Sequence, residues 1–189
     1  SCHFEFANMT TSCVLYARTG EYFTAKLLDA NYNPLVNKSV QIGFNGKIYS
    51  RTTDEKGSFR LQVNLASVGG YTFAISYLGD DSYNASFAVA KIIVEKNPTK
   101  LYVKKTTYKS VESTKTLTAS LELADGTPVS GRTIKFTVAG KTYSAKTNSN
   151  GIATVNISLT AKKTYTYTVS FGGDSQCNAV TASAKLVIN

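Results

Sequence analysis

Residues 128–151, PVSGRTIKFTVAGKTYSAKTNSNG, repeat a stretch that begins 94 residues earlier in this 189-residue chain, at residues 34–57. The register continues on both sides without a gap, pairing residues 25–94 with residues 119–188, and 21 of these 70 pairs are identical, or 30%. A period of 94 residues is too long for one unit of a solenoid and is typical of a complete small domain. The sequence therefore predicts two tandem copies of one domain.

Apolar and polar residues alternate over short segments in each copy. Phe59, Leu61 and Val63 flank the polar Arg60 and Gln62, a pattern typical of a half-buried strand. Such segments are separated by turn residues roughly every 8–12 positions, and the composition is rich in residues that favour strands, with twelve Tyr and nine Phe. We therefore expect an all-β fold with one β-sandwich in residues 1–96 and a second in residues 97–189.

The alternation also predicts which side chains are buried. Lys26 and Gln62 should point outward, and the neighbouring apolar positions inward. We expect Asn45-Gly46 to form a two-residue hairpin turn and Gly57 to adopt the left-handed conformation. The predicted buried set is Leu27, Ile42, Leu61, Val63, Phe73 and Ile75 in the first copy, and Leu121, Phe136, Val155, Ile157, Tyr167 and Val169 in the second.

Several of the repeated motifs resemble a known family. Gly-Lys-x-Tyr at residues 46–49, Thr-Asp-x-x-Gly at 53–57 and Gly-Asp-x-x-x-Asn at 79–84 all recur 94 residues later, with Asn148 replacing the aspartate of the second motif. In this order they resemble the bacterial-type Ig-like repeats of archaeal and bacterial adhesin-like surface proteins. The resemblance implies two tandem Ig-like β-sandwich domains, an extracellular location at the cell surface, and a stalk or adhesive role without a catalytic residue or cofactor.

Charge is shared unevenly between the copies. Residues 1–96 hold nine Lys/Arg and eight Asp/Glu, or +1, whereas residues 97–189 hold twelve and four, or +8; together they give the net charge of +9. The lysines of the second copy are scattered among threonines and lack the stacking aromatics of a nucleic-acid motif. An alternative function is the binding of an anionic polymer, a polysaccharide or the less favoured nucleic acid, by the basic second domain.

Catalytic and metal chemistry have little support. The only histidine, His3, lies at the N-terminus, and the three cysteines do not have the spacing of a zinc site. Asp54, Glu55, Asp80 and Asp81 could supply calcium ligands, but the second copy loses most of this charge, and turn chemistry accounts for these residues. We predict no catalytic, cofactor or metal site, and no apolar run long enough to span a membrane.

The disulfide candidates are Cys2, Cys13 and Cys177. A bond between Cys2 and Cys13 would require a hairpin within that segment, because a single strand would hold them roughly 36 Å apart. Cys177 lies in a loop that should face the first domain. This leaves two options, a Cys13–Cys177 bond across the domain junction, which is preferred, or a bond between chains.

Four N-x-S/T sequons, at Asn8, Asn37, Asn84 and Asn156, are possible N-glycosylation sites. The positions of Asn37 and Asn84 in loops, and of Asn156 on the outward side of a strand, are compatible with a bulky glycan.

The function that these features favour is a stalk segment, or a subunit of a filament that assembles head to tail. The partners would be neighbouring Ig-like domains or like subunits, with a surface polymer or a ligand on another cell as a further possibility. Loop charges suggest an acidic end on the first domain and a basic end on the second. The predicted contact residues are Asp54, Glu55, Asp80 and Asp81 at the acidic end, and Lys141, Lys162 and Lys163 at the basic end, which is also expected to hold Lys115.

Overall fold

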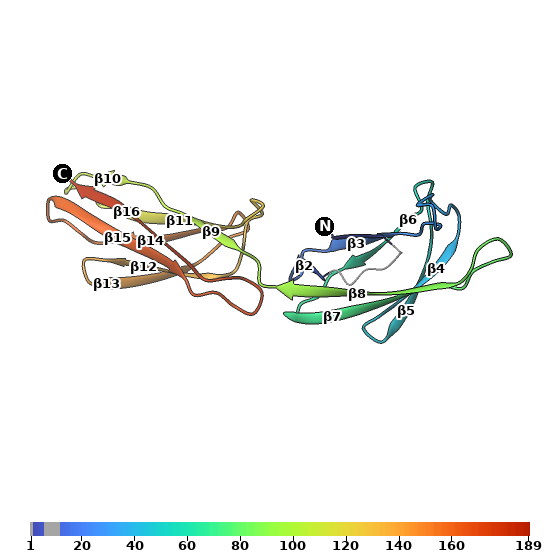
Figure 1. The fold of residues 1–189 in the computed structure, drawn as a ribbon. Coiled ribbons are helices and arrows are strands. Elements are labelled where there is room, and N and C mark those ends of the chain that lie inside the picture. Colours follow the sequence, from blue (N-terminus) through green and yellow to red (C-terminus); the bar gives the residue numbers. More distant parts are fainter. Residues whose placement is uncertain (1, 6–11) are drawn as a thin grey trace. The chain divides into compact units, whose positions relative to one another are not determined.

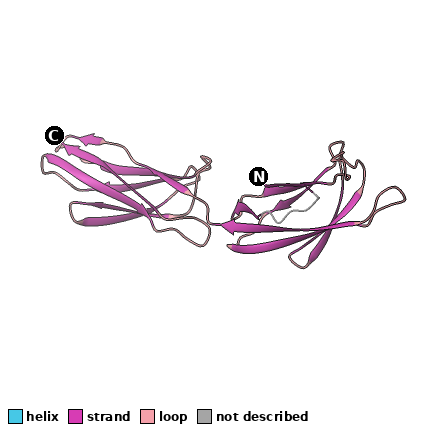
Figure 2. Ribbon diagram, in the orientation of Figure 1, coloured by secondary structure: helices cyan, strands magenta, loops and turns pink. Residues whose placement is uncertain are grey.

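The computed structural model describes residues 2–5 and 12–189 of the chain, which divides into two compact units, Ser1–Lys96 and Asn97–Asn189. Strands and connecting turns make up all of the described part, without a helix, as Figures 1 and 2 show. The first unit contains β1 (Cys2–Glu5), β2 (Ser12–Tyr16), β3 (Glu21–Lys26), β4 (Ser39–Phe44), β5 (Lys47–Thr52), β6 (Ser58–Val63), β7 (Gly69–Tyr77) and β8 (Ser86–Glu95). The second contains β9 (Thr99–Tyr102), β10 (Thr106–Tyr108), β11 (Lys115–Leu123), β12 (Thr133–Val138), β13 (Lys141–Lys146), β14 (Ile152–Ile157), β15 (Lys163–Phe171) and β16 (Val180–Ile188).

Each unit is a sandwich of a three-stranded and a five-stranded sheet. The strand orders are β1-β3-β6 and β2-β8-β7-β4-β5 in the first unit, and β14-β11-β9 and β10-β16-β15-β12-β13 in the second. In both units the first strand segment is split between the two sheets, and most other pairs are antiparallel. This is the Ig-like topology, so the predicted fold class is confirmed.

The two units differ at the start of the chain. In the second unit β9 pairs with β11 antiparallel, with Leu101 opposite Leu121. In the first unit β1 pairs with β3 parallel, with Cys2 opposite Phe23. β2 lies in the other sheet and runs parallel to β8. The segment before Tyr22 is therefore where the repeat fails as a guide to structure.

The core of each unit lies between its two sheets and follows the predicted alternation. All twelve side chains predicted to be buried are buried, and Gln62 is exposed. In the first unit the rings of Phe23 and Phe44 stack on Phe73, with centroids 4.5 Å and 4.1 Å apart. In the second unit Tyr167 occupies the position of Phe73, and its hydroxyl donates to the carbonyl of Lys104 at 2.6 Å. Volume is thus filled by an aromatic stack in one core, and by a tyrosine with a satisfied hydroxyl in the other.

The repeated glycines and prolines hold the turns together. Gly57 and Gly151 have φ angles of +69° and +75°, as predicted for Gly57. A Cβ on Gly57 would lie 2.6 Å from the Leu27 carbonyl oxygen and one on Gly151 2.5 Å from that of Leu121, so backbone packing as well as φ requires glycine. Each glycine also lies against the proline of its own copy, Pro34 or Pro128. The turn at residues 45–46 has the predicted positive φ angles, 50° and 74°.

Candidate functional site

The described side chains bring no catalytic constellation together. Among residues 13–189, no three His, Cys, Asp or Glu side chains form a group that could hold a metal ion. His3 and the sequon residue Asn8 lie outside the part of the chain whose side chains are described. Within the described residues there is also no helix long and apolar enough to cross a membrane.

Two of the four predicted acidic contact residues are used inside their own loops. Asp54 Oδ1 accepts hydrogen bonds from the backbone N–H groups of Lys56 at 2.8 Å and Ser58 at 2.9 Å. These bonds, that of Ser58 first, hold the pKa of Asp54 below its ordinary value. Asn148 makes the same two bonds in the second unit, to Asn150 and Ile152. The carboxylate of Asp54 thus stabilises its turn, and the neutral side chain of Asn148 has the same role in the second unit.

Asp80 closes its loop through an ion pair that recurs in the second unit. Its carboxylate pairs with Lys38 and accepts the backbone N–H groups of Ser82 and Tyr83. The hydrogen bond from Lys38 is the main reason that the pKa of Asp80 is far below its ordinary value. In the second unit Asp174 pairs with Arg132 at 2.7 Å. Both members of each pair are partly exposed, so the pair fixes the loop more than it stabilises the unit.

Charges that remain available for a contact are fewer than the sequence suggested. Glu55 and Asp81 are exposed at the acidic end of the first unit, and Lys162 is exposed at the basic end of the second. Lys141 and Lys163 are also exposed and lie over the rings of Tyr143 and Tyr165, at 5.2 Å and 4.8 Å.

Lys115 does not belong to that basic end, contrary to the sequence-based assignment. It is only 4% exposed, and its ammonium group donates to the carbonyls of Ser110 at 3.1 Å and Glu112 at 2.7 Å. Its position on β11 alternates with Leu117 and Ala119, so the side chain points into the sandwich. The buried ammonium group of Lys115 therefore stabilises the turn before β11 through hydrogen bonds to its backbone.

The predicted Cys13–Cys177 bond is wrong. Cys177 is a free thiol, 4% exposed, and its side chain belongs to the core of the second unit. The loop does lie at the N-terminal end of that unit, where the backbone of Asn97 donates to the carbonyl of Gln176, but the thiol turns inward. Burial is the first cause that raises the pKa of Cys177. Cys13 is disulfide-bonded, and the third cysteine, Cys2, has a side chain outside the described part.

The three sequons that the structure describes place their asparagines at the surface. Asn37 and Asn84 lie in exposed turns and loops, and Asn156 is exposed on the edge strand β14.

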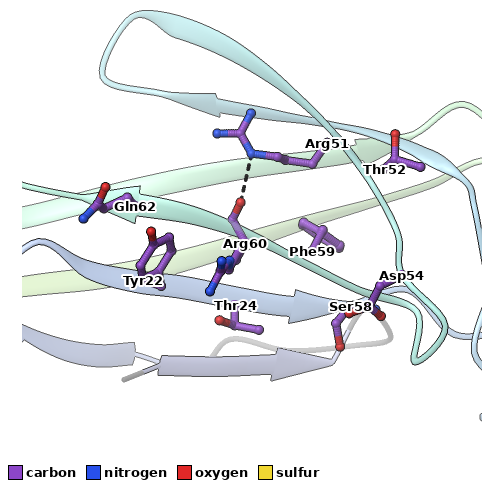
Figure 3. Close-up of a pocket in the computed structure, with 9 residues that line it drawn as sticks. All are labelled: Tyr22, Thr24, Arg51, Thr52, Asp54, Ser58, Phe59, Arg60 and Gln62. Carbon is purple, nitrogen blue, oxygen red and sulfur yellow. Dashed lines mark hydrogen bonds between the residues drawn. The ribbon is translucent and has the colours of Figure 1, made fainter.

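A groove of about 730 Å³ runs along the open edge of the first sandwich, where edge strand β6 of one sheet faces edge strand β5 of the other (Figure 3). Its lining combines Tyr22 and Thr24 of β3, Arg60 and Gln62 of β6, and Arg51 of β5. Arg51 reaches across the edge: its Nε donates to the backbone carbonyl of Arg60 at 2.9 Å. This groove is the candidate functional site.

The arginines of the groove are held in different ways. Arg51 is fixed by its bond to β6 and by a second bond, from Nη1 to the Ser50 carbonyl at 2.8 Å. The guanidinium of Arg60 lies over the ring of Tyr22, with its Cζ 4.3 Å from the ring centroid. Gln62 beside it donates its amide to the carbonyl of Gly20 at 3.0 Å. The site is thus a set of oriented donors on a sheet surface.

Sequence reasoning missed this groove, although a comparison of the copies contains the information. The second unit has Ala145 where the first has Arg51, Thr154 where it has Arg60, and Thr116 where it has Tyr22. All of these positions point outward or lie on edge strands, so packing in the core does not determine which residue occupies them. Residues that differ between copies at such positions indicate specialisation, and this is the pattern that could have located the groove.

Comparison with known proteins gives likenesses of fold. No protein-family model matches the chain. A 1.5-MDa bacterial ice-binding adhesin is 18% identical with a TM-score of 0.42, over 93% of this chain and 60% of that one. Invasin, a bacterial integrin-binding protein, is 16% identical with a TM-score of 0.45, over 92% of this chain and 37% of that one. The titin domains Z1Z2 are 15% identical with a TM-score of 0.47, over 94% and 92%.

The similar structures therefore include bacterial adhesins, the class that the sequence motifs resemble. The chain spans less than two thirds of the length of the bacterial proteins named above. Since every identity is below 20% and every TM-score below 0.5, these likenesses assign no function, and the Ig-like fold rests on the strand topology itself.

Proposed function

We propose that this chain is a non-enzymatic extracellular module, a segment of the stalk of an adhesin-like cell-surface protein. The observation that carries the proposal is that, in each unit, the second segment of the split first strand pairs with the last strand. β2 runs parallel to β8 over five residues, and β10 runs parallel to β16 over three. Figure 1 shows β10 and β16 side by side in the second unit.

Parallel pairing of these strands suits a chain under tension. The N-terminal end of the entering strand and the C-terminal end of the leaving strand lie at opposite ends of the pair. A pull on the chain then slides one strand past the other, so the hydrogen bonds between them are strained together and not one after another. Both units have this arrangement, as repeated segments of a stalk would require.

Single-molecule pulling of the full chain tests the proposal. We expect two separate unfolding events, each releasing roughly 300 Å of chain. Asn189 donates to the carbonyl of Tyr108 and accepts from Ser110, so even-numbered residues of this segment direct their backbone groups to β16. By this alternation Thr106→Pro removes a hydrogen bond of the β10–β16 pair, whereas Thr107→Pro, the matched control, does not.

Thr106→Pro should lower the force of one of the two events, and Thr107→Pro should leave both close to those of the parent. If both units unfold at the low force of an unzipping hairpin, or if Thr106→Pro has no effect on the force, a tension-bearing role is excluded.

The partners we propose are neighbouring Ig-like domains, or like subunits that associate head to tail in a surface filament. The acidic and basic ends support this polarity through Glu55 and Asp81 on one side and Lys141, Lys162 and Lys163 on the other. The triple change of these lysines to Glu should abolish any assembly seen by light scattering at low salt. Two results would contradict the filament proposal: a parent chain that stays monomeric at low salt, or a triple variant that assembles equally well. The proposal of a stalk segment would not be affected by either result.

Binding of an anionic polymer by the basic second unit is the alternative from the sequence. Its net charge of +8 supports it, but Lys115 is buried and Arg132 is paired with Asp174. Retention on a polyanion column that elutes steeply with salt would favour this alternative.

A further inference from the structure

We propose that the groove of the first unit, around Arg51 and Arg60, is a binding site for an acidic saccharide, a sugar unit that carries a carboxylate or a sulfate. The proposal goes beyond a stalk role, and neither depends on the other.

The groove offers more hydrogen-bond donors than it uses. A guanidinium has five N–H groups. Two N–H groups of Arg51 donate to the carbonyls of Arg60 and Ser50, so three N–H groups remain available to a ligand. Among the described residues, the guanidinium of Arg60 has no hydrogen-bond acceptor, and its contact is with the ring of Tyr22. Two planar cations with free donors fit the planar or trigonal oxygens of a carboxylate or a sulfate.

The one carboxylate in the lining does not neutralise these cations. Asp54 lies at the Ser58 end of the groove (Figure 3), and its Oδ1 is bonded to the backbone of its own turn. Between described residues, the ion pairs are Lys38–Asp80 and Arg132–Asp174, so neither arginine of the groove belongs to one. A ligand anion would therefore meet positive charge that no protein carboxylate has satisfied.

The arginines are also oriented in advance. Two hydrogen bonds fix Arg51, and a cation–π contact with the ring of Tyr22, at 4.3 Å, restrains Arg60. Side chains that are already ordered lose less conformational entropy when a ligand binds. The volume of about 730 Å³ is within the range of small-molecule sites.

The rest of the lining fits a sugar better than a peptide. Thr24, Ser58 and Gln62 offer hydroxyl and amide groups that can both donate to and accept from sugar hydroxyls. A peptide would be expected to add as a strand to the edge of β6. The Nε of Arg51 already occupies the Arg60 carbonyl on that edge, which opposes strand addition.

The second copy supplies the substitutions for a test. Arg51→Ala, Arg60→Thr and Tyr22→Thr each install the residue that the same fold carries at Ala145, Thr154 or Thr116. They are therefore compatible with a folded unit, which amide spectra of the full chain would verify. Thr106→Val in the second unit is a control that leaves the groove untouched.

The full chain is titrated with an oligogalacturonate, a sulfated oligosaccharide, a neutral oligosaccharide of the same length and a poly-glutamate peptide, with amide chemical shifts as the readout. We expect saturable shifts confined to β3, β5 and β6 with at least one acidic saccharide and none with the neutral one. Arg51→Ala or Arg60→Thr should each weaken binding about tenfold or more. Preference for the carboxylated or the sulfated sugar tells which group the site recognises.

Three results would overturn the proposal: no saturable binding of either acidic saccharide, equal binding by the Arg51→Ala/Arg60→Thr variant, or tighter binding of poly-glutamate than of both sugars. Shifts confined to the second unit would overturn it too, and would support binding by the basic unit instead.

Discussion

The two units share their turns and differ on their surfaces. Both copies keep the contact between Pro34 and Gly57, the Thr53 hydroxyl that accepts the backbone N–H of Lys38, and the Asp80 carboxylate that accepts backbone N–H groups of its own loop. The corresponding residues of the second unit, 94 positions later, make the equivalent contact and hydrogen bonds. These are positions where the backbone needs a particular φ angle or a hydrogen-bond partner, so the fold itself prevents them from changing.

The outer face of the five-stranded sheet shows how far the surfaces have diverged. In the first unit a row of residues, Ile48, Gly43, Ala74 and Val89, crosses four strands, with Ile48 73% exposed. The equivalent row in the second unit is Thr142, Thr137, Thr168 and Ser183. The groove with its arginines belongs to the same unit as the apolar row. The outer face of this sheet is therefore more apolar in the first unit and lined by hydroxyl groups in the second.

Changes at the shared turns should have the largest effect in both units. Gly57→Ala and Gly151→Ala should each cost about 4 kcal/mol of the free energy of unfolding, because the new Cβ meets a carbonyl oxygen and the φ angle is positive. Gly46→Ala is the matched control: its φ is +74°, but nothing lies within 4 Å of a new Cβ, and it should cost about 1 kcal/mol. Urea unfolding measures both, and equal losses would mean that φ alone matters.

The units should respond differently at the first core-facing position of β3 and β11. Lys115→Met should cost about 3 kcal/mol, because two carbonyls lose their donor inside the fold. Glu21 is the counterpart, and it accepts hydrogen bonds instead, from the backbone of Tyr16 at 3.2 Å and the hydroxyl of Thr19 at 3.1 Å. Glu21→Met should cost less, about 1 kcal/mol, since its bonds are exposed. Lys163→Met serves as an exposed control, and similar losses for all three would contradict the buried role of Lys115.

Reduction of the disulfide should affect the stability of the two units differently, because their cysteines are in different states. Cys13 is disulfide-bonded and Cys177 is free, so a reductant should destabilise the first unit by about 2 kcal/mol and leave the second unchanged. Hydrogen exchange read unit by unit in the full chain measures this. Mass mapping without reduction should find one free thiol, Cys177, and a Cys2–Cys13 bond, since Cys13 is bonded, Cys177 is free and Cys2 is the third cysteine of the chain. A dimer linked through Cys13 would contradict it.

The smallest predicted difference concerns acid. The backbone N–H groups of Ser58 and Lys56 lower the pKa of Asp54 from 3.8, so its stabilising effect is present above pH 4 and is lost as the pH falls through the folded-state value. Asn148 makes the same bonds without titrating. Asp54→Asn should therefore flatten the acid limb of the stability–pH curve of the first unit between pH 4 and pH 2. The amide signals of each unit, recorded during an acid titration, measure this change. An unchanged limb would place the acid sensitivity of that unit at Asp80 or Asp29, whose pKa values are also lowered.

Much of this fold follows from the alternation and the repeat. The period-two pattern placed Phe73 and Tyr167 in their cores because a one-residue slip would have exposed every apolar side chain. Lys115 shares the parity of Leu117 and Ala119, so alternation alone is compatible with its inward position, whereas its charge favours a place at the surface. The direction of β1 was not predictable, because the residues before Tyr22 have no counterpart in the second copy. The groove depends on how two edge strands approach each other, and alternation within single strands does not contain that information.

The opposite charges at Glu21 and Lys115 have a consequence for how the chain folds during synthesis. Adjacent domains of one fold can exchange strands, because each offers the other a segment of the right length and pattern. If β11 took the place of β3, the ammonium of Lys115 would meet the backbone N–H of Tyr16, a donor facing a cation, where Glu21 now accepts. Leu117 would also replace Phe23 and leave Phe73 without one of its two stacked rings. We therefore expect the sequence divergence between the two copies to disfavour strand exchange between them as the chain folds.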